Sequence, residues 1–411
     1  MRTTDNGGAW FWDWAAVAIS LAALSVGLIL AYQHRGQTSA DLIHDAKVYD
    51  ELAKALLAEH RYKTTYWPPG FVVLTAGVYA VFGAKVWAVY AAQAVLFAAS
   101  ILLVYQAARI VTAHRGIALA SCAAWATWPV GYIMVCRLLP SALSAFLMSM
   151  SVYLVAICFN GSSAKNCFRA GLALGASAVT VAATLPFGLA SAVLMRWSRR
   201  GEHTTRRPAA WLLLGLACFT LPWTLYASYK VKAPVLGSTG GGFNFYLGNC
   251  PPWDREPWRG DFPESIARRI EGVSDARRDG ILLREGLRCI AGNPLRAVVR
   301  FGQKFSHLWL GELGLAKAVR TPYGAFDPVR RPIVRVPLFL LAVLGIFLAP
   351  AEWRRRAAPV IIMLVAVTGV YVLVTAEARY SFPMIPYALF FAVVALNRIG
   401  QAAAGVLTRH W

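Results

Sequence analysis

The sequence predicts an all-α membrane protein that crosses the bilayer about ten times. Hydrophobic residues make up 58% of its 411 residues, and charged residues make up only 15%. Apolar runs of roughly 18 residues or more recur along the chain, which is the length a helix needs to cross about 30 Å of hydrocarbon. The runs are apolar on every face and rich in Leu, Ala and Val, which favours helices over the alternating strands of a membrane barrel.

Several of the expected spans have features of their own. The first begins near Trp10 behind a weakly charged N-terminus, and we expect it to be retained as a signal anchor. The second is short and begins at Pro69, so we expect it to be tilted or partly covered by protein. The last contains Pro383 and Pro386 near its start, which should kink it. The expected spans are 10–32, 69–83, 86–108, 116–135, 140–159, 170–195, 209–228, 333–350, 357–375 and 380–397.

Basic residues set the expected orientation. The net charge is +21, and many basic residues flank apolar runs, so membrane orientation and anionic lipid explain it better than nucleic acid, for which no recognition motif is present. Residues 196–208 carry five arginines and residues 352–356 carry three, so both loops should be cytoplasmic. Counting spans from these loops places residues 33–68, 229–332 and 376–380 together on the outer face. We therefore expect a multi-pass protein of the inner (plasma) membrane, with its functional residues on the periplasmic or extracellular side.

The spans divide the chain into three parts. Residues 1–228 form an N-terminal transmembrane module that includes the outer loop 33–68, and residues 333–411 form the C-terminal transmembrane helices. Between them, residues 229–332 form an outer loop of roughly 100 residues, whose second half is expected to contain two or three amphipathic helices. The loop 33–68 also contains an amphipathic segment, whose apolar stripe can lie on the membrane.

The chain has seven cysteines. Cys250 and Cys289 lie in the long outer loop and could pair if that loop faces an oxidising compartment. Two cysteines do not make a disulfide framework, so the sequence leaves the pairing open. The others lie in or beside apolar spans, where Cys167 marks a span edge and the rest are interpreted as packing residues: Cys122, Cys136, Cys158 and Cys218.

An acidic cluster opens the amphipathic segment of the first outer loop. Within it, Asp45 and Tyr49 lie one turn apart on the same face of the expected helix. One interpretation makes Asp45 a general base at the bilayer surface. The other makes it an N-cap aspartate on a surface helix, with the neighbouring acids in solvent, and composition alone favours this second interpretation.

Fixed positive charges are expected near the same face. Arg379 closely precedes the prolines of the last span, and an arginine at a membrane edge suits a phosphate group as well as it suits lipid headgroups. Arg296, Arg300 and Lys304 recur every four residues, so they share one face of an expected helix. That face suits either a phosphate or the headgroups beneath an interfacial helix.

In order and spacing, these motifs resemble the GT-C glycosyltransferases, and most closely the branch of bacterial protein-mannosyltransferase-like and aminoarabinose-transferase-like enzymes. The resemblance begins with Asp45-x-x-x-Tyr49, Tyr62 and Pro68-Pro69-Gly70-Phe71 and runs along nearly the whole chain. It implies a helical fold of the GT-C type. Further matches are Gly171-Leu-Ala-Leu-Gly175, Leu221-Pro222-Trp223-Thr224, Ser238-Thr239-Gly240-Gly241-Gly242-Phe243-Asn244, Gly248-Asn249, Asn293-Pro294 with Lys304, and Arg379-Tyr380-x-x-Pro383.

The resemblance implies an inverting transfer of a sugar from a polyprenyl-phosphate donor to a lipid, glycan or protein acceptor at the outer face of the membrane. Its catalytic base maps onto Asp45, and we assign the donor phosphate first to Arg379, with Lys63, Arg300 and Lys304 as further candidates. No cofactor is certain, although one or two acids near Asp45 could hold a divalent cation. The candidates for binding the sugar or the prenyl chain are Tyr49, Tyr66, Trp67, Asn244, Tyr246, Asn249, Glu377 and Tyr380.

The chain departs from the family's pattern at several places. Ala46 stands where a second acid often follows the base, and Tyr226-Ala227 stand where Arg-Asn often follows the Pro-Trp pair. Thr180-Val181 replace a frequent arginine, and Pro140-Ser141 replace a frequent acid. These departures leave the identity of the donor open.

The sequence therefore leaves two alternative functions open. An O-antigen-ligase-type transferase would use outer-loop arginines together with a histidine, for which His307 is the candidate. A non-catalytic or transporter-like membrane protein is the other alternative, although the spans contain few of the buried charges that transporters use.

Overall fold

All the secondary structure in the computed structural model is helical over the residues that it describes, which are 9–161, 163–197, 206–250, 262–311 and 332–407. This confirms the predicted all-α fold class. Within these ranges, five helices are long and apolar enough to cross a membrane, or six if the bent pair over residues 115–135 counts as one span. Parts of the predicted loops 196–208 and 229–332, and Arg409, lie outside the described residues.

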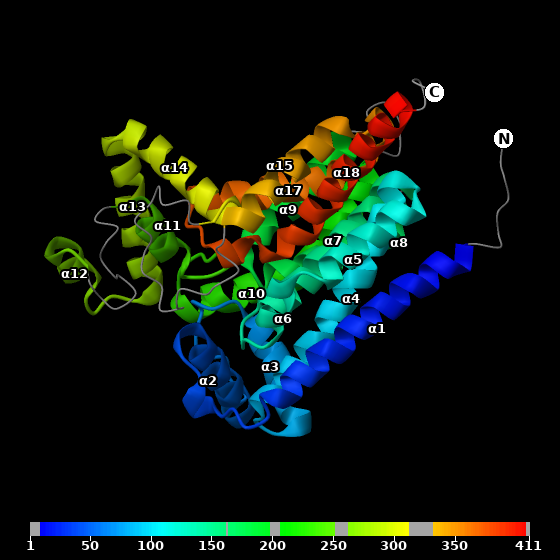
Figure 1. Ribbon diagram of the computed structural model, residues 1–411. Helices are drawn as coiled ribbons and strands as arrows, with labels where there is room; N and C mark the ends of the chain where they lie inside the picture. The colour runs from blue at the N-terminus through cyan, green and yellow to red at the C-terminus, as the bar shows by residue number, and fades with distance from the viewer. Residues whose placement is uncertain (1–8, 162, 198–205, 251–261, 312–331, 408–411) are drawn as a thin grey trace.

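The first part of the chain forms most of the bundle (Figure 1). Its short 3₁₀ turns are η1 (Ser39–Asp41) and η2 (Ala182–Thr184). Its helices are α1 (Ala9–Gln33), α2 (His44–Glu59), α3 (Pro69–Phe82), α4 (Val86–Thr112), α5 (Arg115–Ala126), α6 (Pro129–Val135), α7 (Ser141–Gly161), α8 (Ala164–Ala178), α9 (Leu185–Trp197) and α10 (Arg206–Val231).

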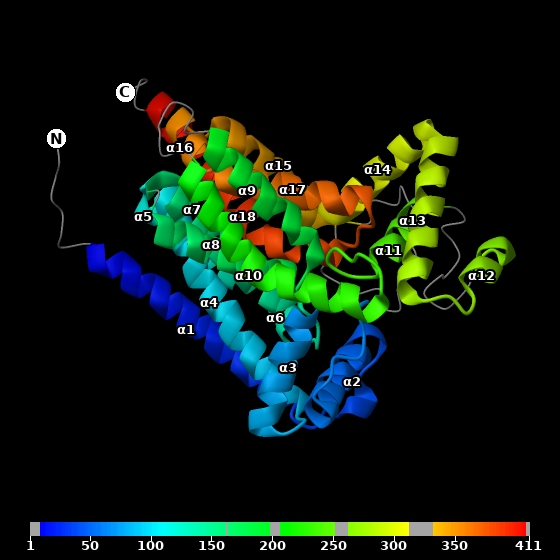
Figure 2. The same cartoon turned by 180° about the vertical axis from the view of Figure 1, so that it is seen from behind.

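The remaining helices form two groups. One group projects beside the bundle and consists of α11 (Gly241–Asn249), α12 (Glu264–Ile270), α13 (Asp275–Gly292) and α14 (Pro294–Trp309). The other completes the bundle with α15 (Pro332–Leu348), α16 (Ala351–Arg356), α17 (Ala358–Leu373), the 3₁₀ turn η5 (Ala378–Met384) and α18 (Ile385–Leu407). Figures 1 and 2 show α2 and the α11–α13 group at one end of the bundle, while the start of α1 and the end of α18 lie at the other.

Helices α1 and α4 run antiparallel, which changes the expected path of the second span. Near the start of α1, Asp13 pairs with Arg109 late in α4 at 2.7 Å. At the opposite end, the Tyr90 hydroxyl early in α4 donates to Gln37, just after α1, at 3.0 Å. Helix α4 therefore begins at the end where α1 finishes, and the predicted crossing by residues 69–83 is wrong.

The predicted single span 170–195 is also wrong, because it forms two helices. Gly171 faces Leu212 of α10 and Gly175 faces Leu216, so α8 and α10 run in the same direction. The chain then breaks at Val181, which has extended backbone, and α9 returns to place Met195 beside Cys158 at the end of α7. One crossing fewer at α3 and one more here offset each other, so the loops that follow stay at the predicted ends.

Two disulfides hold segments of the bundle and of the projecting group. Cys250 and Cys289 are joined, which settles the pairing that the sequence left open and ties the end of α11 to α13. Cys158 and Cys167 are joined as well, across the turn between α7 and α8. Cys158 is 1% exposed within the hydrophobic core, so its interpretation as a packing residue is confirmed, and the bond to Cys167 is a feature that the sequence analysis did not expect.

Helix α2 is fixed on α3 by a buried carboxylate. Asp50 is 1% exposed and accepts a hydrogen bond from the Tyr79 hydroxyl at 2.6 Å and another from Lys54 at 2.8 Å. A buried carboxylate that loses a donor is destabilising. We expect Tyr79→Phe to lower the unfolding free energy by about 2 kcal/mol, measured as a lower midpoint of thermal unfolding in detergent. Tyr229→Phe removes the same hydroxyl from a side chain that is 86% exposed, and equal midpoints for the two variants would contradict this role of Asp50.

Candidate active site

Asp45 lies in the first turn of α2. The helix begins at His44 with Ile43 in the N-cap position, so the interpretation of Asp45 as the N-cap is wrong. In the first turn, a negative charge is stabilised by the helix dipole. Tyr49, one turn further along, is buried with its ring 5.0 Å from the ring of Trp67 and 5.0 Å from that of Phe71. Helix α2 therefore buries its tyrosine and leaves the Asp45 side chain at the rim, 34% exposed.

Arg379 meets Asp45 across the fold. Its Nη2 donates to Oδ2 of Asp45 at 3.0 Å, a contact between residues 334 positions apart in the sequence. The Nε atom of the same guanidinium is 2.6 Å from Oε2 of Glu377. The guanidinium also lies 5.5 Å from the ring centroid of Tyr380, which stacks on Tyr371. One arginine thus stands between two carboxylates and an aromatic pair.

Arg335 holds the turn that carries Arg379. It is 3% exposed near the start of α15, and its guanidinium donates to the carbonyl of Ala378 at 3.0 Å and to the Ser381 hydroxyl at 3.1 Å. A further bond reaches the carbonyl of Leu308 at the end of α14. The sequence analysis missed this residue. An ionisable side chain near the start of an apolar span was the signal that could have found it.

Lys304 and Asn249 hold the segment just before that turn. The Lys304 ammonium is buried and donates to Oδ1 of Asn249 at 2.9 Å and to the carbonyls of Leu373 and Val374 at 3.1 and 3.2 Å. Burial, and then the nearby charge of Arg300, lower the pKa of Lys304 to about 7. Asn249 also donates to the carbonyl of Leu373 at 2.9 Å. Both side chains therefore bind the protein's own backbone where α17 ends.

Two of the positions that depart from the family's pattern, Tyr226 and Thr180, lie against the segment between α2 and α3 or against the start of α3. Tyr226, standing where an arginine is frequent, donates to the carbonyl of Tyr62 at 2.8 Å. The amide of Gly70 donates to the carbonyl of Val179, beside Thr180, at 2.9 Å. A Cβ atom on Gly70 would lie 2.2 Å from the Thr180 hydroxyl, so a glycine is required here. Tyr226 and Thr180 thus contact the loop that carries Asp45 and the helix that follows it.

Tyr66 and Trp67 form an aromatic wall next to Asp45. The Tyr66 ring lies 5.3 Å from Trp67 and 6.1 Å from Phe243 of α11. Burial raises the pKa of the Tyr66 hydroxyl to about 12, and the charges of Asp45 and Asp279 add to the increase. The phenol therefore stays protonated, as a hydrogen-bond donor facing two acids.

Asp279, which the sequence analysis missed, closes the start of α11. Its Oδ1 accepts from the backbone amides of Gly242 at 2.7 Å and Phe243 at 3.1 Å. A Cβ on Gly242 would lie 2.0 Å from the backbone carbonyl of Asp279, which explains a glycine at this position. Asn244 donates to the carbonyl of Gly240 at 2.8 Å and so supports the same turn. No local sequence signal links residue 279 to this turn.

The pH dependence of stability should report on Asp279. Burial raises the pKa of its carboxyl from 3.8 to about 6. Because the folded protein then binds the proton more tightly than the unfolded chain does, the stability from this group is complete below pH 4 and is lost as the pH rises towards 6. We expect wild type to lose stability relative to Asp279→Asn over this range, measured by thermal unfolding. Asp275→Asn on the same helix should run parallel to wild type, and a constant difference for Asp279→Asn would contradict the shift.

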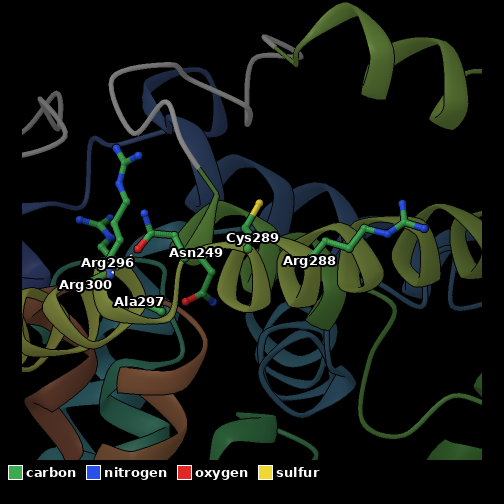
Figure 3. Close-up of a pocket in the computed structure, with 8 residues that line it drawn as sticks. Asn249, Arg288, Cys289, Arg296, Ala297 and Arg300 are labelled. Atoms are coloured by element: carbon green, nitrogen blue, oxygen red, sulfur yellow. Dashed lines mark hydrogen bonds between the residues drawn. The ribbon is translucent and has the colours of Figure 1, made fainter.

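The other predicted residues lie elsewhere. Lys63 pairs with Glu59 at 2.5 Å, near the opposite end of α2 from Asp45. Tyr246 is buried in a cluster with Phe262, beside the Cys250–Cys289 disulfide. Arg300 lines a cavity between α11, α13 and α14 (Figure 3). The structure therefore brings Asp45, Tyr49, Tyr66, Trp67, Glu377, Arg379 and Tyr380 together, and it gathers Asn249, Arg300 and Lys304 at a neighbouring position.

The two carboxylates of the candidate site, Asp45 and Glu377, lie on either side of the Arg379 side chain. Asp45 and Glu377 both contact the Arg379 guanidinium, so a side chain of this protein already supplies the positive charge beside them. Over the described ranges, no group of three His, Cys, Asp or Glu side chains gathers as metal ligands. These residues fit a divalent cation poorly as they stand.

The chain is similar in sequence to one protein family and in fold to solved membrane proteins. Residues 67–225 match the family described as dolichyl-phosphate-mannose-protein mannosyltransferase. The fold is similar to that of the archaeal oligosaccharyltransferase AglB from Archaeoglobus fulgidus, solved with an inhibitory peptide and a dolichol-phosphate, at 13% identity and a TM-score of 0.52. This similarity covers 95% of the chain and 52% of AglB, so the chain spans about half the length of that protein.

A further solved structure aligns over most of the chain. ArnT from Cupriavidus metallidurans, solved bound to undecaprenyl phosphate, aligns at 16% identity with a TM-score of 0.40, over 97% of this chain and 79% of that one. Comparison with curated protein sequences finds no match. The similarity to AglB establishes a shared fold.

Proposed function

Because this chain has the fold of the GT-C membrane glycosyltransferases, we propose that it transfers a sugar from a polyprenyl-phosphate donor to a lipid, glycan or protein acceptor. The transfer inverts the anomeric carbon and takes place at the outer face of the membrane, with Asp45 as general base. The known ligands of related folds agree with this donor class, since AglB was solved with a dolichol-phosphate.

The contact between Asp45 and Arg379 carries the proposal. A base and a fixed cation, far apart in sequence, meet at the 3.0 Å contact while both side chains remain partly exposed, 34% and 21%. A purely structural ion pair in the core would be fully covered. Partial exposure beside an aromatic wall leaves the pair open to a substrate.

Asp45 and Arg379 have different roles in the proposed reaction. The Asp45 carboxylate takes the proton of the acceptor as the acceptor attacks the anomeric carbon, from the side opposite the phosphate. The bond from that carbon to the phosphate oxygen breaks, and its electron pair leaves with the polyprenyl phosphate. Negative charge then grows on the leaving phosphate, where the Arg379 guanidinium stabilises it. A carboxylate has acceptor capacity for several donors, so Asp45 can contact Arg379 and the acceptor together.

The surrounding residues complete the proposed site. Tyr66 and Trp67 offer ring faces and a phenolic donor to the sugar, and Glu377 keeps Arg379 aligned. Lys304 and Asn249 act by holding the backbone at Leu373 and Val374, a few residues before Arg379. The donor phosphate is therefore proposed for Arg379 in preference to Lys63, Arg300 or Lys304.

A transfer assay tests this function. Purified protein is mixed with radiolabelled polyprenyl-phosphate sugars and envelope acceptors, and the anomeric configuration of the product is determined. Labelled product with inverted configuration is expected. Retention of configuration would contradict a single displacement, and absence of product with every donor would favour a non-catalytic protein.

A further inference from the structure

A second polar cavity lies at the elbow between α13 and α14. Its volume is about 170 Å³, which exceeds the space of a few waters but falls below that of a drug-sized site. None of its lining residues is acidic, and they come from the projecting helices alone. They are Asn249, Arg288, Cys289, Gly292, Asn293, Arg296, Ala297 and Arg300.

Two arginines form the charged wall of this cavity. Arg296 and Arg300 lie one turn apart on α14, and Figure 3 shows both side chains on the same side as Asn249. Arg288 contributes its aliphatic stem, while its guanidinium extends away from the other two and pairs with Glu285 at 2.6 Å. Arg300 bonds the carbonyl of Gly248 at 3.2 Å, and burial lowers its pKa. A guanidinium presents its N–H donors in a planar fork, a geometry that matches the oxygens of a phosphate.

The walls are held in place by the chain itself. The Cys250–Cys289 disulfide ties the end of α11 to α13. At the elbow, the Asn293 side chain accepts from the backbone amide of Arg296 at 3.0 Å and fixes the start of α14. The cavity is therefore preorganised, which reduces the entropy lost when a ligand binds.

An exposed apolar surface adjoins the arginines. Leu295, Val298 and Val299 are 76%, 63% and 55% exposed on the neighbouring face of α14. Contiguous exposed apolar side chains beside basic ones are typical of surfaces that meet lipid. In both Figures 1 and 2, α14 runs across the direction of the bundle helices.

We propose that this cavity binds the phosphate group of a membrane lipid, with Arg296 and Arg300 holding the phosphate oxygens and the alkyl chains lying along Leu295, Val298 and Val299. The site is distinct from the Asp45–Arg379 pair, which the proposed function assigns to the sugar donor. Binding there does not depend on the proposed transfer reaction.

Calorimetric titration of the full chain in neutral detergent tests the proposal. The probes are dihexanoyl phosphatidic acid, dihexanoyl phosphatidylcholine and inorganic phosphate. We expect the phosphatidic acid to bind in preference to the other two, and Arg296→Gln/Arg300→Gln to weaken it about 10-fold or more, since two charge-assisted contacts are lost. Arg277→Gln/Arg284→Gln removes the same charge from exposed positions of α13 outside the cavity and should change the affinity less than about 2-fold.

Further variants separate the possible outcomes. Arg296→Gln alone leaves the Arg300 bond to Gly248 intact and should also weaken lipid binding. It provides the test if the double variant unfolds. Leu295→Ser should weaken the lipid and leave inorganic phosphate unaffected. Equal affinity for inorganic phosphate and phosphatidic acid would overturn the lipid assignment, and equal loss in the α13 control, or no binding by wild type, would overturn the site. Asp45→Asn should bind as wild type does, so failure of the transfer reaction and failure of this site are distinguishable.

Discussion

Asp45→Asn is expected to lower the rate of sugar transfer by at least about 100-fold, because general-base catalysis contributes factors of this size and larger. The amide keeps the shape of the side chain and can still accept a hydrogen bond from Arg379, but it cannot take a proton from the acceptor. Initial rates with a labelled polyprenyl-phosphate sugar, at saturating donor and acceptor, measure the change. Because the loss falls on the chemical step, kcat should fall while the KM for the donor changes little.

Asp41→Asn is the matched control. It removes one negative charge from the same loop, where the Asp41 carboxylate accepts from the backbone amide and hydroxyl of Thr38 at 2.7 and 2.9 Å. Its rate should stay within about 2-fold of wild type, since an exposed charge contributes little. Transfer that survives Asp45→Asn unchanged would remove Asp45 as the base.

Arg379→Gln should lower kcat/KM by about 100- to 1000-fold, the range found when a donor that stabilises a developing anion is removed. Glutamine can still hydrogen-bond Asp45, but it carries no charge to stabilise the leaving phosphate. Arg379→Lys should recover part of the loss, because an ammonium supplies the charge without the fork that reaches Asp45 and Glu377 together. Steady-state kinetics across a range of donor concentrations measures both variants.

The arginine variants need a control for stability and for charge. Arg61→Gln removes an exposed arginine from the same end of the molecule and should leave the kinetics close to those of wild type. Thermal unfolding midpoints identify any variant whose Glu377–Arg379 turn has collapsed. If Arg379→Gln folds and transfers at the rate of wild type, the donor phosphate is held elsewhere, and Lys63, Arg300 and Lys304 become the candidates again.

The sequence predicted the fold class well because hydrophobicity averaged over a whole span is a strong signal. It failed where local hydropathy does not decide the path. Residues 69–83 are as apolar as a span, yet α3 stays at one end because α4 pairs back along α1. Residues 170–195 are apolar throughout, and only the extended backbone at Val181 divides them into two helices.

The pairing of Asp45 with Arg379 was within reach of the sequence, since loop charges placed both residues on one face. The bonds that position them were not. Arg335, Asp279 and Lys304 act through bonds to the backbone of distant segments, and the partners in such bonds depend on packing that no local pattern records. The Cys158–Cys167 disulfide was not predicted, because Cys158 lies in an apolar span and was interpreted only as a packing residue.

A double-mutant cycle on Asp45 and Arg379 tests the central claim most directly. If both side chains act in one transition state, the rates of Asp45→Asn, Arg379→Gln and the double variant will be strongly non-additive, with the double variant about as slow as the slower single one. Single-turnover rates with labelled donor, normalised to folded protein, provide the four values. Losses that multiply in the double variant would show that the two residues act independently, and would contradict an active site built on their contact.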